Sequence, residues 1–146
     1  MNSNQLDQKL NTNPITALVF RGTYAANELP TKFNQVPIAF VVNEDFSWNP
    51  GTHWVAIYIR TMHHVEYFDS LGNPPTKTIA QYLTSFPYIS RNVKAYQSKY
   101  STVCGLYTIF FIYLCTLGYS VPQIEQILSE QSNPDLFVTE FVNKYI

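Results

Sequence analysis

Apolar residues cluster in runs whose periodicity predicts several strands in the middle of the chain. Residues 38–42 are continuously apolar and mostly β-branched, which is typical of a strand buried on both faces. In residues 53–59 both sets of alternating positions are largely apolar, so this strand also has two covered faces. Another strand is predicted over residues 65–69, after the hairpin-length connection 60–64. Residues 92–97 are predicted to form the last strand.

Helical periodicity dominates the second half of the chain. Apolar residues spaced at i, i+3, i+4 and i+7 predict an amphipathic helix over residues 76–86. Residues 104–117 are apolar almost all round, which indicates a helix packed in the interior. Two further helices are predicted to begin at the capping residues Ser120 and Asn133. The pattern therefore predicts an α+β fold, with a small, mostly antiparallel sheet packed on a buried central helix.

The length of 146 residues fits one domain. Residues 1–13 are polar and have no apolar core, so we expect a flexible N-terminal lead rather than a secretory signal. Residues 14–146 are then a single domain. The longest apolar stretch, around 109–117, is too short to cross a bilayer, so no membrane association is expected.

The composition excludes several classes of protein and of site. Hydrophobic residues make up 46% of the chain and charged residues 13%, which excludes disorder and a charged coiled coil. The net charge of −1 provides no general attraction for nucleic acid or anionic membrane. Two cysteines cannot form a disulfide scaffold, nor a cysteine-based zinc site with the three histidines. We therefore expect no metal or other cofactor, a monomer, and a reducing compartment.

Cys104 is the candidate nucleophile, because it stands where a polar loop gives way to the apolar helix. Unpaired N–H groups at a helix start stabilise an anion and lower the pKa of a thiol. The following Gly105 allows another part of the chain to approach closely. Position alone also fits a small core residue, and Cys115, in the middle of the helix, fits only that interpretation.

His53 and Asp69 are candidates for the partners that a thiol nucleophile needs. If their strands form a hairpin, the first residue of one lies beside the last residue of the other. Taken singly, each also fits a structural histidine or a turn-forming acid. His63 and His64 fall in the hairpin tip and are expected to be exposed, while Glu66 falls on the face opposite Asp69.

Gln97 is a candidate for stabilising the transition state of acyl transfer. Its neutral amide, shortly before Cys104 in the chain, would complete an oxyanion hole with the Cys104 backbone N–H. An exposed polar residue at the end of a strand is the alternative.

Four segments surround these residues: Gly51-Thr-His53-Trp54-Val-Ala-Ile, Tyr67-Phe68-Asp69-Ser-Leu-Gly72, Gln97 and Val103-Cys104-Gly105-Leu-Tyr107. Together they resemble the adenain-like cysteine proteases, a group of adenovirus-type maturation proteases with relatives in virophages and Polinton/Maverick elements. The upstream segments Phe20-Arg-Gly22-Thr-Tyr24 and Glu28-Leu29-Pro30 also resemble this group, so the resemblance covers roughly residues 17–118. The pattern is more distantly similar to the SUMO/Nedd8-type deconjugases of the same clan. The residue order differs from papain, in which the cysteine precedes the histidine.

This resemblance implies a papain-like fold of the adenain/Ulp type and a role for each site residue. Cys104 would be the nucleophile and His53 the general acid and base. Asp69 would orient His53, and Gln97 would donate to the oxyanion. The resemblance also implies a substrate groove beside the catalytic residues, formed by Trp54 and Gly105.

The implied function is that of a cysteine endopeptidase. It would process viral or mobile-element capsid or core precursors at Gly-containing sites, in the virion and in the host cytoplasm or nucleus. The alternative is an isopeptidase that removes a ubiquitin-like modifier after Gly-Gly, and a non-catalytic scaffold or an acetyltransferase is less well supported. A peptide activator is left open, but the net charge does not support the DNA cofactor of the adenovirus enzymes.

Overall fold

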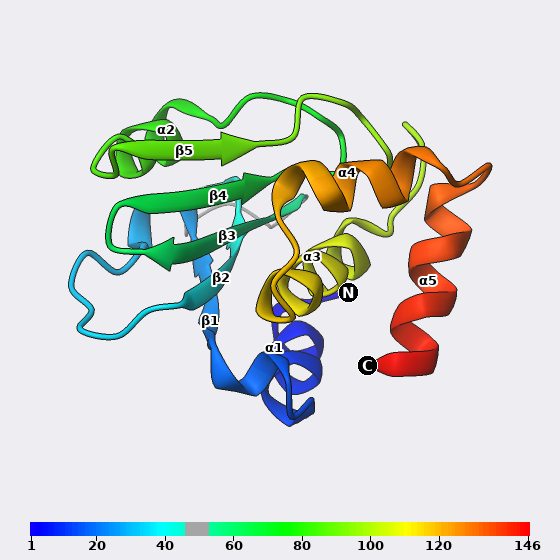
Figure 1. The fold of residues 1–146 in the computed structure, drawn as a ribbon, viewed down its shortest axis with the longest axis horizontal. Helices are drawn as coiled ribbons and strands as arrows, with labels where there is room; N and C mark the ends of the chain where they lie inside the picture. The colour runs from blue at the N-terminus through cyan, green and yellow to red at the C-terminus, as the bar shows by residue number, and fades with distance from the viewer. Residues whose placement is uncertain (46–52) are drawn as a thin grey trace.

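The computed structural model describes residues 1–45 and 53–146, which form a mixed sheet with helices on both faces (Figure 1). The strands are β1 (Phe20–Ala25), β2 (Ile38–Asn43), β3 (Trp54–Thr61), β4 (His64–Phe68) and β5 (Tyr88–Arg91). The α-helices are α1 (Ser3–Thr12), α2 (Lys77–Leu83), α3 (Cys104–Thr116), α4 (Val121–Ser129) and α5 (Pro134–Tyr145). Two short 3-10 turns, Thr16–Leu18 and Ala26–Glu28, flank β1.

The strands follow one another across the sheet in the order β1-β2-β3-β4-β5. The three central strands pair antiparallel, as expected, whereas β1 and β5 pair in parallel at the two edges. The strands predicted over 38–42, 53–59 and 65–69 are confirmed as β2, β3 and β4.

The prediction of a strand over residues 92–97 is wrong, because the last strand is β5 and ends at Arg91. The backbone N–H groups of Tyr96 and Gln97 both donate to the carbonyl of Ser70, at 2.9 Å each. Residues 92–97 therefore bind the turn after β4 instead of extending the ladder.

The two faces of the sheet carry separate hydrophobic clusters, which explains why the central strands are apolar at nearly every position. On β3, Val55, Ile57 and Ile59 contact the cluster that contains α2. Ala56 and Tyr58 point the other way, toward the cluster that contains the remaining α-helices. The sheet is thus a layer between a thin cover on one face and a thick helical layer on the other (Figure 1).

Helix α3 is the central buried helix that the sequence predicts. It packs between β3 and α5, and ten of its thirteen residues are buried. The capping box at Ser120 and the cap at Asn133 are also confirmed, at the starts of α4 and α5. Within residues 1–45 and 53–146, no helix is long and apolar enough to cross a membrane.

Residues 1–13 are not the loose lead expected from their polar composition, because Ser3–Thr12 form helix α1. Leu6 and Leu10, one helical turn apart, are both fully buried in the cluster that contains α3. Two apolar residues at this spacing are enough to attach an otherwise polar helix to the core.

Candidate active site

Cys104 is the first residue of α3 and is only 8% exposed. Burial alone would raise the pKa of its thiol, because it disfavours the thiolate. A hydrogen bond with His53 and the backbone N–H groups of Trp54 and Gly105 act in the opposite direction. Together they lower the pKa of Cys104 below its usual value. The thiol therefore has the environment of a nucleophile rather than of an inert core residue.

His53 lies immediately before β3 and joins Cys104 to Asp69. Its Nε2 lies 2.6 Å from Asp69 Oδ1, so Nδ1 is the ring nitrogen left for Cys104. Burial lowers the pKa of His53, but the hydrogen bonds and charges of Asp69 and Cys104 outweigh burial and raise the pKa to about 10. The imidazole is thus protonated at neutral pH, and it faces a thiol that ionises readily.

Asp69 is fully buried and follows directly after β4. The β3–β4 register pairs Ala56 with Phe68, so one further step places Asp69 opposite Val55 and diagonal to His53 on the same face. The hairpin does bring His53 and Asp69 together, although as diagonal neighbours rather than directly opposite residues.

Asn92 holds Asp69 in place and was not among the residues that sequence reasoning selected. The Asp69 backbone N–H donates to Asn92 Oδ1 at 3.0 Å, and Asn92 Nδ2 donates to the Asp69 carbonyl at 2.6 Å. Leu71 adds a backbone N–H to Asp69 Oδ1 at 2.9 Å. Asparagine often bonds to the backbone in loops, but its partner here lies 23 positions away, where no local pattern shows it.

Gln97 lines the same cleft as Cys104, and neighbouring groups orient its amide. The Ser70 hydroxyl donates to Gln97 Oε1 at 2.6 Å, and Gln97 Nε2 donates to the Ser101 carbonyl at 2.8 Å. The amide oxygen is thus occupied as an acceptor, and one of the two Nε2 hydrogens is occupied as a donor. One N–H of the amide group is left for a substrate oxygen.

His53, Gln97 and Cys104 line a cleft of about 340 Å³, whose other residues include Met1, Trp54 and Leu71, while Asp69 is buried and does not line it. A larger hollow of about 410 Å³ runs along α1, but its lining contains none of the titratable groups described above. The cleft with Cys104 is therefore the candidate site. Gly51 and Thr52 of the histidine motif lie outside the described residues.

Gly105 lies elsewhere than expected, because it is buried and does not line the cleft. A Cβ at this position would lie 3.3 Å from both Leu6 Cδ2 and Met1 Cβ. The close approach that glycine allows here is therefore that of the N-terminal segment to α3.

Glu44 adds a second carboxylate beside His53. Its backbone N–H donates to the His53 carbonyl, and ligand atoms of Glu44, His53 and Asp69 all lie within 4.8 Å of one another. A cation would fit this spacing, but the bond to Asp69 already occupies His53 Nε2 and keeps the ring protonated. Burial raises the pKa of Glu44, and the charge of Asp69 adds to this rise, which the charge of His53 only partly opposes. Glu44 therefore acts on His53 through its charge, while Asp69 holds the hydrogen bond to the ring.

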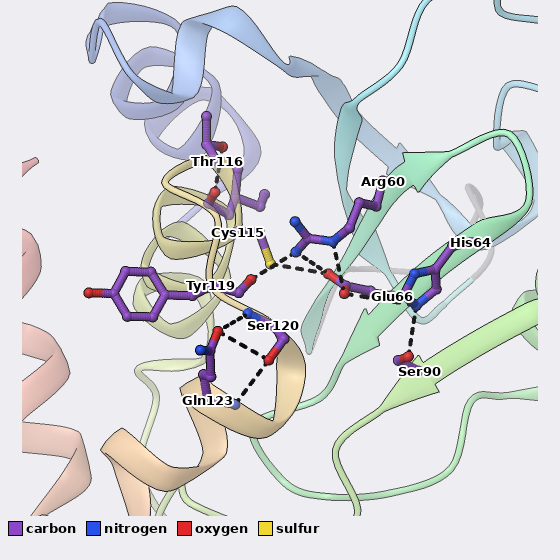
Figure 2. A network of polar contacts seen from close by, with 10 residues as sticks. Arg60, His64, Glu66, Ser90, Cys115, Thr116, Tyr119, Ser120 and Gln123 are labelled. Carbon is purple, nitrogen blue, oxygen red and sulfur yellow. Dashed lines mark hydrogen bonds and ion pairs between the residues drawn. The ribbon is translucent and has the colours of Figure 1, made fainter.

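Cys115 and Glu66 belong to a separate buried network, which links the β3–β4 hairpin to the end of α3 (Figure 2). Glu66 accepts two hydrogen bonds from Arg60, at 3.1 and 2.8 Å, and Arg60 also donates to the Tyr119 carbonyl. Cys115 Sγ lies 3.5 Å from Glu66 Oε2. Burial raises the pKa of Cys115 well above its usual value, and Glu66 adds to the effect. Cys115 is thus an unreactive core residue, as expected.

The two histidines expected in the tip of the β3–β4 hairpin differ in their exposure. His63 is exposed, as expected. His64 instead begins β4, is half-buried, and bonds to the Ser90 hydroxyl at 2.8 Å (Figure 2). It therefore ties β4 to β5 instead of lying free in a loop.

Comparison with known proteins shows similarity to viral proteases. A cysteine protease of African swine fever virus is 33% identical over 85 residues, which cover 49% of this chain and 31% of that protein. A protein of Acanthamoeba polyphaga mimivirus named as a thiol protease is 32% identical over 87 residues, covering 51% of this chain and 28% of that protein. The chain thus matches less than a third of the length of these relatives.

The crystal structure of the African swine fever virus protease shares the fold. It superposes with a TM-score of 0.67 at 18% sequence identity, covering 99% of this chain and 66% of that chain. The sequence pattern of the C-terminal catalytic domain of the Ulp1 protease family matches residues 27–137, which is most of the chain. The chain therefore belongs to the Ulp1 protease family, a family of cysteine proteases.

Proposed function

We propose that the chain is a cysteine endopeptidase that processes viral or mobile-element capsid or core precursors at Gly-containing sites. The observation that carries this proposal is the position of His53 between two partners. It bonds to Asp69 at 2.6 Å and forms a hydrogen bond with Cys104 at the start of α3. We also propose that the chain belongs to the adenain-like branch, which its residue motifs resemble.

The reaction begins when the Cys104 thiolate attacks the carbonyl carbon of the substrate and forms a C–S bond. The negative oxygen of the tetrahedral intermediate accepts hydrogen bonds from Gln97 Nε2 and from the Cys104 backbone N–H. When the C–N bond breaks, the His53 imidazolium gives its proton to the leaving amine. Asp69 keeps the ring oriented and stabilises its positive charge.

The resulting thioester is hydrolysed by water. Neutral His53 takes a proton from the water, whose oxygen attacks the thioester carbon, and the C–S bond then breaks. This step releases the carboxylate product and restores the thiolate–imidazolium pair. The same three side chains therefore carry both halves of the reaction.

The proposed substrate follows from the cleft and from the relatives. Because Trp54 and Met1 stand beside Cys104, the cleft favours residues without bulky side chains, such as glycine, next to the scissile bond. The similar proteins come from large DNA viruses, so a viral or mobile-element precursor is the proposed target, in the virion or in the reducing interior of the host cell. We further propose that the chain acts as a monomer away from membranes, with or without a peptide activator.

An isopeptidase is the second candidate function. Proteins of other African swine fever virus isolates that are 32% identical over 85 residues are named SUMO-1 cysteine proteases. A modifier tail ending in Gly-Gly would need the same narrow cleft beside Cys104. The two candidates differ in whether a large folded modifier must also bind.

The test compares the wild type with Cys104→Ala on two substrates, a Gly-containing capsid-precursor peptide and a ubiquitin-like fusion protein. We expect the wild type to cleave the peptide and Cys104→Ala to cleave neither substrate. Cys115→Ala is the matched control and should retain cleavage, because its thiol is buried. Cleavage that survives in Cys104→Ala would refute the nucleophile, and cleavage of the fusion alone would favour the isopeptidase.

A further inference from the structure

Residues 1–12, the N-terminal segment, have a defined position in the structure. Asn2 Oδ1 accepts from the Gln5 backbone N–H, and Gln5 Oε1 accepts from the Asn2 backbone N–H, each at 2.9 Å. This capping box begins α1, and the fully buried Leu6 and Leu10 attach the helix to the core. The residue in front of α1 is therefore held in place by the domain itself.

Met1 lies over the first turn of α3. A Cβ built on Gly105 would approach Met1 Cβ to 3.3 Å and the Met1 sulfur to 3.6 Å. A Cβ at residue 105 would press on the side chains of Met1 and Leu6, so Met1 packs directly against the turn that presents Cys104. Met1 also lines the same cleft as Cys104, and it keeps 39% of its surface exposed.

Trp54 connects Met1 to the catalytic thiol. Its indole Nε1 donates to the Met1 carbonyl at 3.0 Å, although the two residues are 53 positions apart. Its backbone N–H donates to the sulfur of Cys104. Trp54 is thus bound to the nucleophile at its backbone and to the N-terminal segment at the tip of its ring.

We propose that the N-terminal segment is a specificity-determining wall of the cleft. The Met1 side chain limits the size of the substrate residue that binds beside Cys104, and the Met1 carbonyl positions the Trp54 ring. The inference rests on the proposed peptidase function and adds to it. The match to the Ulp1 catalytic domain begins at residue 27, so this wall is supplied from outside the matched range.

The test changes the size of the wall without disturbing the core. The full chain is prepared with a cleavable leader, so that residue 1 is either Met or Gly. Two peptides differ only in Gly or Leu beside the scissile bond. We expect Met1→Gly to raise kcat/KM for the Leu peptide about 10-fold relative to the Gly peptide, mainly through KM, because it opens space for the larger side chain. Asn4→Ala, an exposed change on α1, is the control and should keep the wild-type ratio.

Alkylation of Cys104 tests the same wall without a substrate. Met1→Gly should speed the reaction with a bulky maleimide about 10-fold while leaving the rate with iodoacetamide unchanged. Unchanged size discrimination in both assays would overturn the inference. Met1→Gly could instead change the alkylation rates while neither peptide is cleaved in a way that depends on Cys104. That result would support the wall and refute the peptidase function.

Trp54→Phe tests the second half of the inference, because it keeps an aromatic ring and removes the N–H donor. We expect size discrimination to weaken in the same direction as in Met1→Gly. Discrimination equal to that of the wild type would show that the Met1 carbonyl does not position the ring.

Discussion

The two cysteines of the chain are both buried, yet their surroundings push the thiol pKa in opposite directions. Cys104 begins a helix and meets a protonated histidine and two backbone N–H groups, which lower its pKa. Cys115 lies in the last turn of α3, not in the middle of the helix, beside the carboxylate of Glu66, and both burial and that charge raise its pKa. Burial alone therefore does not distinguish a reactive thiol from an inert one. The sign of the nearest charge distinguishes the two thiols, because a positive charge lowers the pKa of a thiol and a negative charge raises it.

Replacing His53 with Ala should remove the main interaction that opposes the burial of Cys104. The pKa of Cys104 then rises, so alkylation by iodoacetamide near pH 7 should slow about 10-fold for each unit of the rise. In the wild type the rate should level off at a lower pH than for an ordinary cysteine, because the pKa of Cys104 is lowered. In His53→Ala the rate should still climb above pH 9.

The measurement is the alkylation rate as a function of pH, with Cys115→Ala as the control that should reproduce the wild-type curve. Identical curves for His53→Ala and the wild type would contradict the ion pair between Cys104 and His53.

Peptidase activity should also fall as the pH rises through about 10, because His53 then loses the proton that the leaving amine needs.

Among the elements, the strongly periodic ones were predictable and the weakly periodic ones were not. The strands β2, β3 and β4 and the helix α3 carry long apolar patterns, and each lies where the sequence indicates. Helix α1 was missed because only Leu6 and Leu10 are apolar within it, although its capping box is visible in the sequence. The edge strand β5 is short and partly exposed, so its residues show little periodicity.

Leu10→Ala tests whether α1 is part of the domain. Leu10 is fully buried, so removing its side chain should lower the free energy of unfolding by about 2–5 kcal/mol. Urea denaturation measures the change, and the exposed Asn4→Ala should stay within about 0.5 kcal/mol of the wild type. If Leu10→Ala leaves the free energy of unfolding unchanged, α1 does not contribute to the stability of the domain and residues 1–13 are a flexible lead.

In the whole molecule, the site is assembled from segments that are far apart in the chain. Asp69 is held by Asn92, Gln97 is held by Ser70, and the turn after β4 carries Asp69 and Ser70 side by side. Gly72 closes this turn with a φ of +73°. The turn therefore couples the orientation of His53 to the position of Gln97, the proposed oxyanion donor.

Gly72→Ala should impair catalysis from outside the cleft. A Cβ there would lie 2.6 Å from the Ala95 nitrogen and 2.7 Å from the Lys94 carbonyl carbon, both backbone atoms that cannot rotate away. Residues 92–97 must then shift, and Gln97 shifts with them. We expect kcat to fall about 100-fold, as for a misplacement of about 1 Å.

Steady-state kinetics on the precursor peptide measure this effect, and Gly118→Ala is the matched control. Gly118 also has a positive φ, of +102°, but a Cβ there meets nothing within 4 Å. Gly118→Ala should therefore lower stability by about 1 kcal/mol and leave kcat unchanged. Equal kcat in the two variants would show that the turn does not position Gln97.

The sequence by itself determined the α+β class, the buried helix, the hairpin, and the meeting of His53 with Asp69. Each of these follows from local periodicity or from the geometry of one hairpin, which a chain carries in its own order. The tertiary structure alone decided the parallel edge strands, the support from Asn92 and Ser70, and the placement of Met1 against Gly105. These contacts join residues that no periodic pattern relates, so they arise only when the core brings separate segments together.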